Sequence, residues 1–233
     1  QRKYNQDYKS ALQKGLPLNP LRRQLKVVDP SIDPFEEGAF EVAIRVTNLF
    51  NSVFTMGDQQ TAVLTKTIIK GLEESDNFSL DDLLPLLEAE GQTGITLANK
   101  LTPFIRCKAF SQEGRTPWED MLNATTHKTD ILQLTGRARD IQRIITEFIL
   151  WDLYDHAGSN GHKNAPIPIV LDEIQNLNHN SDSPIDKMLR EGRKFGLSLI
   201  LATQTISNDN YGREGRDRLF QTGHKLFFRP SET

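Results

Sequence analysis

Two short apolar runs near the carboxyl-terminal end constrain the fold of this chain more than any other feature. They open the predicted strands "IPIVLDE" (residues 167–173) and "LSLILATQ" (residues 197–204), and the stretch "SPIDKMLREGRKFG" between them has the pattern of a capped helix. Nearly continuous apolar runs that alternate with helices are typical of parallel strands in a sheet covered on both faces. We therefore expect an α/β protein with a mainly parallel sheet that is covered by helices.

The same alternation extends to both sides of these runs. Two more strands are predicted, over residues 129–136 and 224–229, and two more helices, over residues 137–156 and 213–220. On this pattern, residues 129–233 form one continuous part of the α/β core.

The first part of the chain has a different pattern. Four of the eleven prolines fall within residues 17–34, so we expect an irregular segment there. Apolar residues then recur with a helical period over residues 40–53, and a second helix is predicted over residues 57–74. Residues 1–74 are therefore interpreted as an irregular segment followed by helices of the core.

The stretch over residues 75–128 is more polar, and we interpret it as a helical insertion. Helix starts are predicted at Ser79 and Thr116, because in each case a hydroxyl residue is followed three positions later by an acidic one.

Composition excludes several classes of protein. The net charge is -3, and no run approaches the roughly 20 apolar residues that cross a bilayer, so no membrane association is expected. The single cysteine, Cys107, excludes an internal disulfide and a cysteine-based zinc site, which favours a cytoplasmic protein. The five histidines show no metal-ligand spacing and are expected to be solvated. Because the chain begins with Gln and stops just after a strand-like run, we expect it to be a piece of a larger protein.

Polar side chains close three of the predicted strands. Asp172 and Glu173 close the strand from Ile167, Gln204 closes the strand from Leu197, and Thr135 and Gly136 close the strand over residues 129–136. The carboxyl ends of parallel strands meet at one edge, where ligands of such sheets bind. Nucleotide hydrolysis uses one carboxylate toward Mg²⁺, a second to activate water, and a neutral amide at the γ-phosphate. A buried strand that simply ends in solvent remains the alternative interpretation of the two acids.

The combination "PIVLDEIQNL … MLREGRKFGLSLILATQ" resembles the HerA/FtsK-like branch of P-loop ATPases, which includes the motors that pump DNA. Three other stretches agree in order: "LPLNPL", "LFNSVFTMGDQQ" and "ILQLTGRARDIQRIITEFILWDLY". The closing "TGHKLFFRPSE" is similar to the family's last core strand. Within the branch, the chain is most similar to HerA-like subunits of bacterial defence systems, such as the ATPase of DNA phosphorothioation-dependent restriction.

The resemblance implies a fold, cofactors and partners. The fold is a RecA/FtsK-like P-loop core, the cofactors are ATP and Mg²⁺, and the activity is ATP-driven translocation of double-stranded DNA by a homo-hexamer, with a possible nuclease partner. Asp172 is the implied magnesium-side carboxylate, acting through water, and Glu173 the implied catalytic base. Gln204 is the implied γ-phosphate sensor, and Arg193, or failing that Arg190, the implied arginine finger that acts on a neighbouring subunit.

One departure from the family is large. No G-x-x-x-x-G-K-[ST] sequence occurs, so the loop that cradles the phosphates is not among these residues, and this chain alone is expected to be inactive. Two rivals stay open: an ATPase of the conjugation or secretion type that moves protein or single-stranded DNA, and a degenerate ring subunit without activity. The basic clusters Arg22–Arg23, Arg137–Arg139 and Arg213–Arg216–Arg218 could each face DNA, an interface or water.

Overall fold

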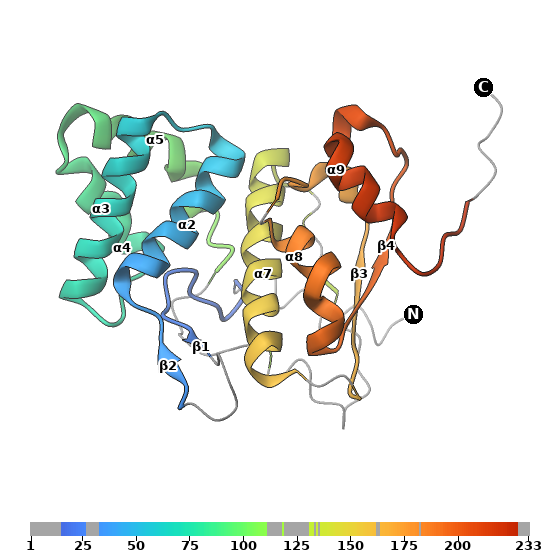
Figure 1. Ribbon diagram of the computed structural model, residues 1–233. Helices are drawn as coiled ribbons and strands as arrows, with labels where there is room; N and C mark the ends of the chain where they lie inside the picture. Colours follow the sequence, from blue (N-terminus) through green and yellow to red (C-terminus); the bar gives the residue numbers. More distant parts are fainter. Residues whose placement is uncertain are drawn as a thin grey trace, which may run out of the picture. The chain divides into compact units, whose positions relative to one another are not determined.

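The computed structural model describes residues 15–26, 33–110, 118, 131–132, 134, 136–161, 164–181 and 183–227. Helices predominate in it, together with two small two-stranded sheets, one antiparallel and one parallel (Figure 1). By the density of internal contacts, the chain divides into two compact units, residues 1–159 and residues 160–233. No helix within the described residues is both long enough and apolar enough to span a bilayer.

The first unit is built from helices. Their bounds are α2 (Ala39–Phe54), α3 (Asp58–Glu74), α4 (Leu80–Glu88), α5 (Gly91–Arg106) and α7 (Arg139–Asn160), the last of which ends at the border of the second unit. A small antiparallel pair precedes α2, formed by β1 (Leu25–Lys26) and β2 (Phe35–Glu36). The helices predicted over residues 40–53, 57–74 and 137–156 are confirmed, and α4 and α5 supply helices in the stretch predicted as an insertion. The boundaries of that insertion stay predictions, and the predicted helix start at Thr116 lies outside the described residues.

Aromatic rings from three helices form the centre of this unit. The ring of Phe50 in α2 lies 5.5 Å from that of Phe104 in α5 and 5.4 Å from that of Phe148 in α7, both edge to face. All three side chains are at most 2% exposed. Each such pair stabilises the fold by about 0.5–1.5 kcal/mol beyond the area it buries. Three helices that are distant in sequence are therefore joined at one point.

The turn between α3 and α4 depends on a close contact and a cap. A Cβ atom on Gly71 would overlap the ring of Phe78, so only glycine lets that ring pack against α3. One residue later, Ser79 caps α4: its backbone N–H donates to the Asp82 carboxylate at 3.0 Å, and the Ser79 hydroxyl donates to the same carboxylate at 2.6 Å. This capping box confirms the helix start predicted at Ser79.

A buried carboxylate ties the amino-terminal segment to α7. Asp152 accepts hydrogen bonds from the Arg22 guanidinium, at 2.8 and 3.1 Å, from the amide of Gln24 at 3.1 Å, and from the indole of Trp118 at 2.7 Å. The Asp152 side chain is only 4% exposed. A charge this deep is stable only when it is paired and hydrogen-bonded, and these three donors satisfy it. Trp118 is thus a buried side chain that anchors to α7 through its indole.

A second carboxylate in α7 is held less favourably. Burial raises the pKa of Asp155 above its ordinary value, although Lys26, whose ammonium lies 3.0 Å from the carboxylate, and the charge of Arg45 oppose the shift. Ionisation of Asp155 therefore costs the folded state more than the unfolded chain.

We expect Asp155→Asn to change how stability depends on pH. A raised pKa in the folded state means that stability is lost as pH rises above about 4, where the unfolded carboxyl ionises, until the folded one has ionised too. The variant lacks this loss, so its free energy of unfolding should gain on that of the wild type between pH 4 and pH 7. Urea denaturation at both pH values measures the difference. The prediction would be contradicted if the free energy of unfolding of the wild type rose relative to that of the variant between pH 4 and pH 7.

The second unit contains the predicted parallel pair. Strands β3 (Ile167–Leu171) and β4 (Leu197–Leu201) pair in parallel, with Ile167 opposite Leu197 and Leu171 opposite Leu201. Between them run the short 3-10 helix η2 (Ile174–Asn176), α8 (Pro184–Glu191) and the 3-10 helix η3 (Gly192–Phe195), and α9 (Asn208–Phe220) follows β4. Ser183 caps α8 and Gly196, at φ 81°, ends η3, as their places in the sequence predict.

One face of the pair packs on helices and the other does not. Leu171 and Leu201 join a cluster with Ile174, Ile185, Tyr211 and Leu219, which come from η2, α8 and α9. On the opposite face, Val170 is 67% exposed and Ile200 57% exposed. The α/β prediction is thus confirmed only as one parallel pair with helices on one face.

Two predicted strands are wrong where they can be checked. Residues 131–132, 134 and 136 of the strand predicted over 129–136 are described, and none belongs to a strand. Residues 224–227 of the strand predicted over 224–229 are irregular, with Leu226 85% exposed. A strand needs a neighbour that accepts and donates its backbone hydrogen bonds, and the described residues place none beside these runs. No complete RecA-like core can be traced in the described part of the chain.

Candidate functional site

The two predicted site segments lie side by side because the strands stay joined beyond their ends. The Ala202 N–H donates to the Leu171 carbonyl at 2.8 Å, and the Ile174 N–H donates to the Ala202 carbonyl at 3.1 Å. These bonds hold the residues after β3 against the residues after β4. Asp172 and Glu173 therefore adjoin Thr203 and Gln204.

Glu173 has an unusual backbone conformation. Its φ of 54° and ψ of 41° lie in the left-handed region, which a residue with a side chain seldom adopts. The turn is supported by Asp172, whose Oδ1 accepts from the Glu173 N–H at 2.9 Å. Strain of this kind costs about 1–3 kcal/mol and is concentrated at functional sites. This backbone conformation directs the Glu173 side chain across the end of β4.

Gln204 meets Glu173 directly. The Gln204 Nε2 donates to Glu173 Oε1 at 2.5 Å, although the two residues are 31 positions apart. Asp172 and Gln204 are exposed, and Glu173 is half-buried. The structure thus brings together the two acids and the amide that sequence reasoning selected.

Three residues in contact with this group were missed from the sequence. Gln175 donates to the second oxygen of Glu173, and Thr203 and Tyr211 lie behind Gln175 in the same set of hydrogen bonds. The place of Thr203 directly before Gln204 was a usable signal, because its backbone shares the same strand end. Tyr211 carries no such signal in the sequence. His179, predicted to be solvated, is instead 7% exposed, and its ring lies 4.4 Å from that of Tyr211.

Arg190, the second choice for the arginine finger, is paired within its own helix. Its guanidinium lies 2.8 Å from Asp186, whose side chain is 1% exposed. Arg218 from α9 lies 2.5 Å from the other oxygen of Asp186 and also donates to the His179 carbonyl at 3.2 Å. Two arginines therefore share one buried carboxylate, and this group joins α8, α9 and the loop before α8.

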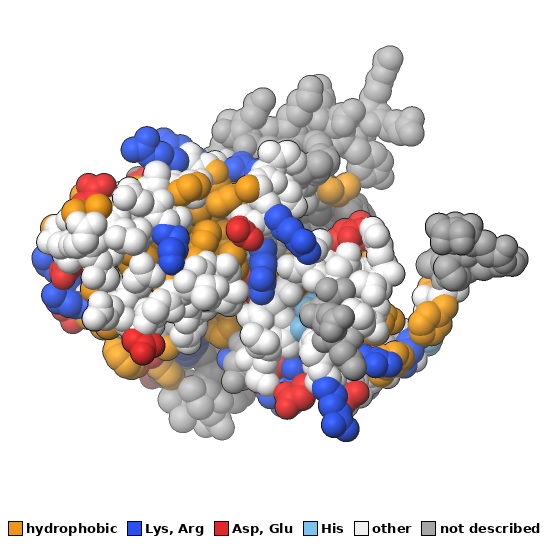
Figure 2. Space-filling model, turned by 90° about the horizontal axis from the view of Figure 1, so that it is seen from above, with side chains coloured by type: hydrophobic (Ala, Val, Ile, Leu, Met, Phe, Trp, Pro, Cys, Tyr) orange, Lys and Arg blue, Asp and Glu red, His pale blue; other side chains and the backbone are white. Residues whose placement is uncertain are grey.

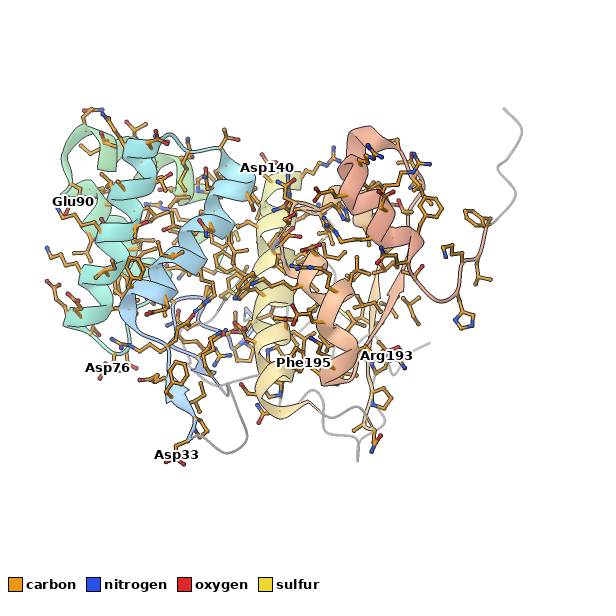
Figure 3. All side chains as sticks on the ribbon, viewed as in Figure 1. Asp33, Asp76, Glu90, Asp140, Arg193 and Phe195 are labelled. Atoms are coloured by element: carbon orange, nitrogen blue, oxygen red, sulfur yellow. The ribbon has the colours of Figure 1, made fainter. Side chains whose placement is uncertain are left out.

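Arg193 lies in η3, at the end of the sheet where β4 begins (Figure 3). It is exposed, and its side chain makes no hydrogen bond or ion pair with the other residues that the structure describes. Glu173 and Gln204 lie beyond the opposite ends of the strands, and five residues of strand span about 16 Å. Arg193 cannot reach the Glu173 of its own chain. Thr135, the remaining candidate, lies outside the described residues.

The Asp186 group leads to a stability prediction. Arg218→Ala should lower the free energy of unfolding by about 2–4 kcal/mol, because it removes a nearly buried partner of a buried charge. Arg190→Ala should cost less than about 1 kcal/mol, because the Arg190 side chain is 46% exposed and Arg218 still pairs with Asp186. Urea denaturation of the two variants measures the difference. Equal losses would show that Arg218 has no special part in joining α8 to α9.

The donor set suits a magnesium ion that keeps most of its water. No group of three metal-ligating residues occurs in the part of the chain that the structure describes. Asp172 offers one exposed carboxylate whose Oδ2 has no partner among the described residues. Mg²⁺ is commonly held by one or two carboxylates, several waters and the phosphates of a substrate. The residues present fit that mode of binding and do not fit a closed protein cage.

The chain was compared with protein-family models and with curated protein sequences. No protein-family model matches the chain, and no curated protein sequence matches it.

Proposed function

We propose that this chain supplies the magnesium-side and water-activating residues of an ATP-hydrolysis site in a HerA-like translocase of double-stranded DNA. The resemblance of its motifs to bacterial defence ATPases suggests a DNA-processing or restriction system. The observation that carries the proposal is the group at the carboxyl ends of β3 and β4, where Asp172 and Glu173 adjoin Gln204.

Each residue of this group has a role that its chemistry supports. Asp172, exposed and with a free oxygen, would hold Mg²⁺ through water, and the ion would neutralise charge on the phosphates. Glu173 would accept a proton from the attacking water, because its carboxylate is held in place beside the strand ends. Gln204 would give up its hydrogen bond to Glu173 and bind the γ-phosphate instead. Its exposed and neutral amide can contact the phosphate without adding charge.

Arg193 is a better arginine finger than Arg190 under this proposal. Arg190 is already paired with Asp186, whereas Arg193 is exposed and unpaired within the described residues. Because Arg193 lies at the far end of the sheet, it would have to act on the site of a neighbouring subunit. A closed ring, such as the homo-hexamer that the resemblance implies, brings opposite faces of successive subunits together.

The proposed P-loop core goes beyond the described architecture. One parallel pair with its crossover helix is the part of such a core that these residues supply. Because the sequence contains no G-x-x-x-x-G-K-[ST], the loop around the phosphates would have to come from outside these 233 residues.

Of the three basic clusters, the one that contains Arg213 is the best candidate for a contact with DNA. Arg22 and Arg23 have partners in their own unit, the Asp152 carboxylate and the Leu72 carbonyl, and Arg137 donates to the Cys107 carbonyl. Arg213 in α9 is exposed and has no partner among the described residues. Basic and acidic side chains of the described residues are interspersed in Figure 2. Charge reversal at Arg213 should weaken DNA binding and flatten its salt dependence.

The test is ATP hydrolysis by the complete protein that contains this chain, at fixed salt, with and without double-stranded DNA. We expect hydrolysis that increases with DNA and is lost in Glu173→Gln, and negligible turnover by the 233-residue chain alone. Inert wild type and variant that both assemble into rings would instead indicate a non-catalytic ring subunit. Stimulation by single-stranded DNA or protein alone would indicate the conjugation or secretion type.

A further inference from the structure

Both carboxylate oxygens of Glu173 are held by amides, and the two amides come from different surroundings. Gln204 Nε2 donates to Oε1 from the exposed end of β4, and Gln175 Nε2 donates to Oε2 from η2. Gln204 is exposed and Gln175 is half-buried. The carboxylate therefore has one partner that solvent or a ligand can replace, and one that is less accessible.

A line of hydroxyl groups continues from Gln175 into the interior. The Thr203 hydroxyl donates to Gln175 Oε1 at 2.8 Å and lies 2.5 Å from the Tyr211 hydroxyl. It also accepts from the Thr205 N–H at 3.3 Å. Tyr211 is 3% exposed and belongs to the apolar cluster of this unit with Ile174. The line thus connects the Glu173 carboxylate to the buried apolar cluster of this unit.

The charge of Glu173 sets the direction of every bond in this line. An ionised carboxylate only accepts, so Gln175 must turn its NH₂ group toward Glu173 and its oxygen toward Thr203. Thr203 then gives its one proton to Gln175, in competition with the Thr205 carbonyl at 2.8 Å, and Tyr211 donates to Thr203. Burial raises the pKa of Tyr211; its bond with Thr203 opposes the shift, and the charge of Glu173 adds to it, so the phenol keeps its proton.

We propose that Gln175, Thr203 and Tyr211 are positioning residues for Glu173. These three residues fix the Glu173 carboxylate from the interior. Gln204 can then move to another partner without displacing that carboxylate. This inference rests on the proposed ATP-hydrolysis site, because it names the residues that hold the base of that site. The strained backbone of Glu173 needs such support, since a left-handed turn alone leaves the side chain free to rotate.

The experiment compares kcat and KM for ATP in the complete protein with Thr203→Val, Thr203→Ser and Tyr211→Phe. Thr205→Val is the matched control, because the Thr205 side chain makes no bond in this line and only its backbone contacts Thr203. We expect Thr203→Val to lower kcat by about 10- to 100-fold with KM within about twofold, the usual size when a residue that orients a reacting group is lost. Tyr211→Phe should lower kcat by about 3- to 10-fold, because it removes only the last donor of the line.

Rescue separates positioning from a merely structural role. Thr203→Ser retains the hydroxyl and should restore kcat to near the wild-type value, and Thr205→Val should leave it unchanged. The inference is overturned if Thr203→Val keeps wild-type kcat, or if kcat and the melting temperature fall together and Thr203→Ser rescues neither.

A second measurement distinguishes failure of this inference from failure of the proposed function. If the wild type shows no hydrolysis that depends on Glu173, the ATPase proposal fails. The line is then tested by the side-chain amide signals of Gln175 in ¹H–¹⁵N NMR spectra of the 233-residue chain. Tyr211→Phe and Glu173→Gln, one at each end of the line, should both shift these signals, and Thr205→Val should not. Unshifted signals in both variants would refute the line itself.

Discussion

Asp152→Ala is expected to lower the free energy of unfolding by about 3–5 kcal/mol. Removing one partner of a buried ion pair leaves the other charge without compensation, which accounts for a loss of this size. Here Arg22, Gln24 and Trp118 all lose their acceptor at once. Because Asp152 joins the amino-terminal segment to α7 across 130 positions, the loss should affect the whole first unit. Urea denaturation followed by tryptophan fluorescence measures it, since both tryptophans, Trp118 and Trp151, belong to this unit.

Asp140→Ala is the matched control for that experiment. Asp140 is an exposed carboxylate in the first turn of the same helix (Figure 3), so its removal should cost less than about 1 kcal/mol. A double-mutant cycle with Arg22→Ala should reveal a coupling energy of about 1.5–3 kcal/mol, since the two residues share several bonds. Equal losses for Asp152→Ala and Asp140→Ala would mean that the buried network does not hold the segment to α7.

The helices and the central strands follow from local patterns in the sequence. Apolar residues at a helical period define α2 and α3 on their own, and the hydroxyl–acid spacing at Ser79 gives the start of α4. For β3 and β4 the apolar runs were sufficient, because both strands end at polar residues and a capped helix separates them. Each of these features is decided by residues within a few positions of one another.

The features that the sequence did not predict depend on distant partners. A strand-like run such as "HKLFFR" becomes a strand only if a neighbour takes its backbone hydrogen bonds, and the residues of the run itself do not show whether such a neighbour exists. The ion pair of Arg22 with Asp152 likewise has no local signal, because either residue alone has the pattern of a solvated charge.

The candidate site divides in the same way. Asp172, Glu173 and Gln204 could be selected because the ends of adjacent parallel strands must meet, whatever follows them. The line from Gln175 to Tyr211 could not, since it depends on how α9 packs after the turn at Gln204. The pairing of Arg190 with Asp186 has a local signal, the i, i+4 spacing of the two residues, and this pairing favours Arg193 over Arg190 as the proposed arginine finger.

Under the proposed function, Glu173→Gln should lower kcat for ATP hydrolysis by the complete protein by about 10²- to 10⁴-fold, the usual contribution of a general base. Glutamine keeps the size of the side chain, and its oxygen still accepts from Gln204 or Gln175, but it cannot take a proton from water. Binding of ATP should therefore stay within a few-fold of the wild type. Single-turnover hydrolysis and equilibrium binding of a fluorescent ATP analogue measure the two quantities separately.

Asp172→Asn makes the comparison specific, because the two acids are neighbours with different proposed roles. Loss of the magnesium-side carboxylate should raise the Mg²⁺ concentration needed for half-maximal hydrolysis, while Glu173→Gln should leave that concentration unchanged. Activity of Glu173→Gln above about a tenth of the wild type, well short of the loss expected for a general base, would mean that another group accepts the proton. In that case the left-handed turn at Glu173 and its two amide partners would serve only to join the ends of β3 and β4. The two acids would then mark a buried strand that simply ends in solvent.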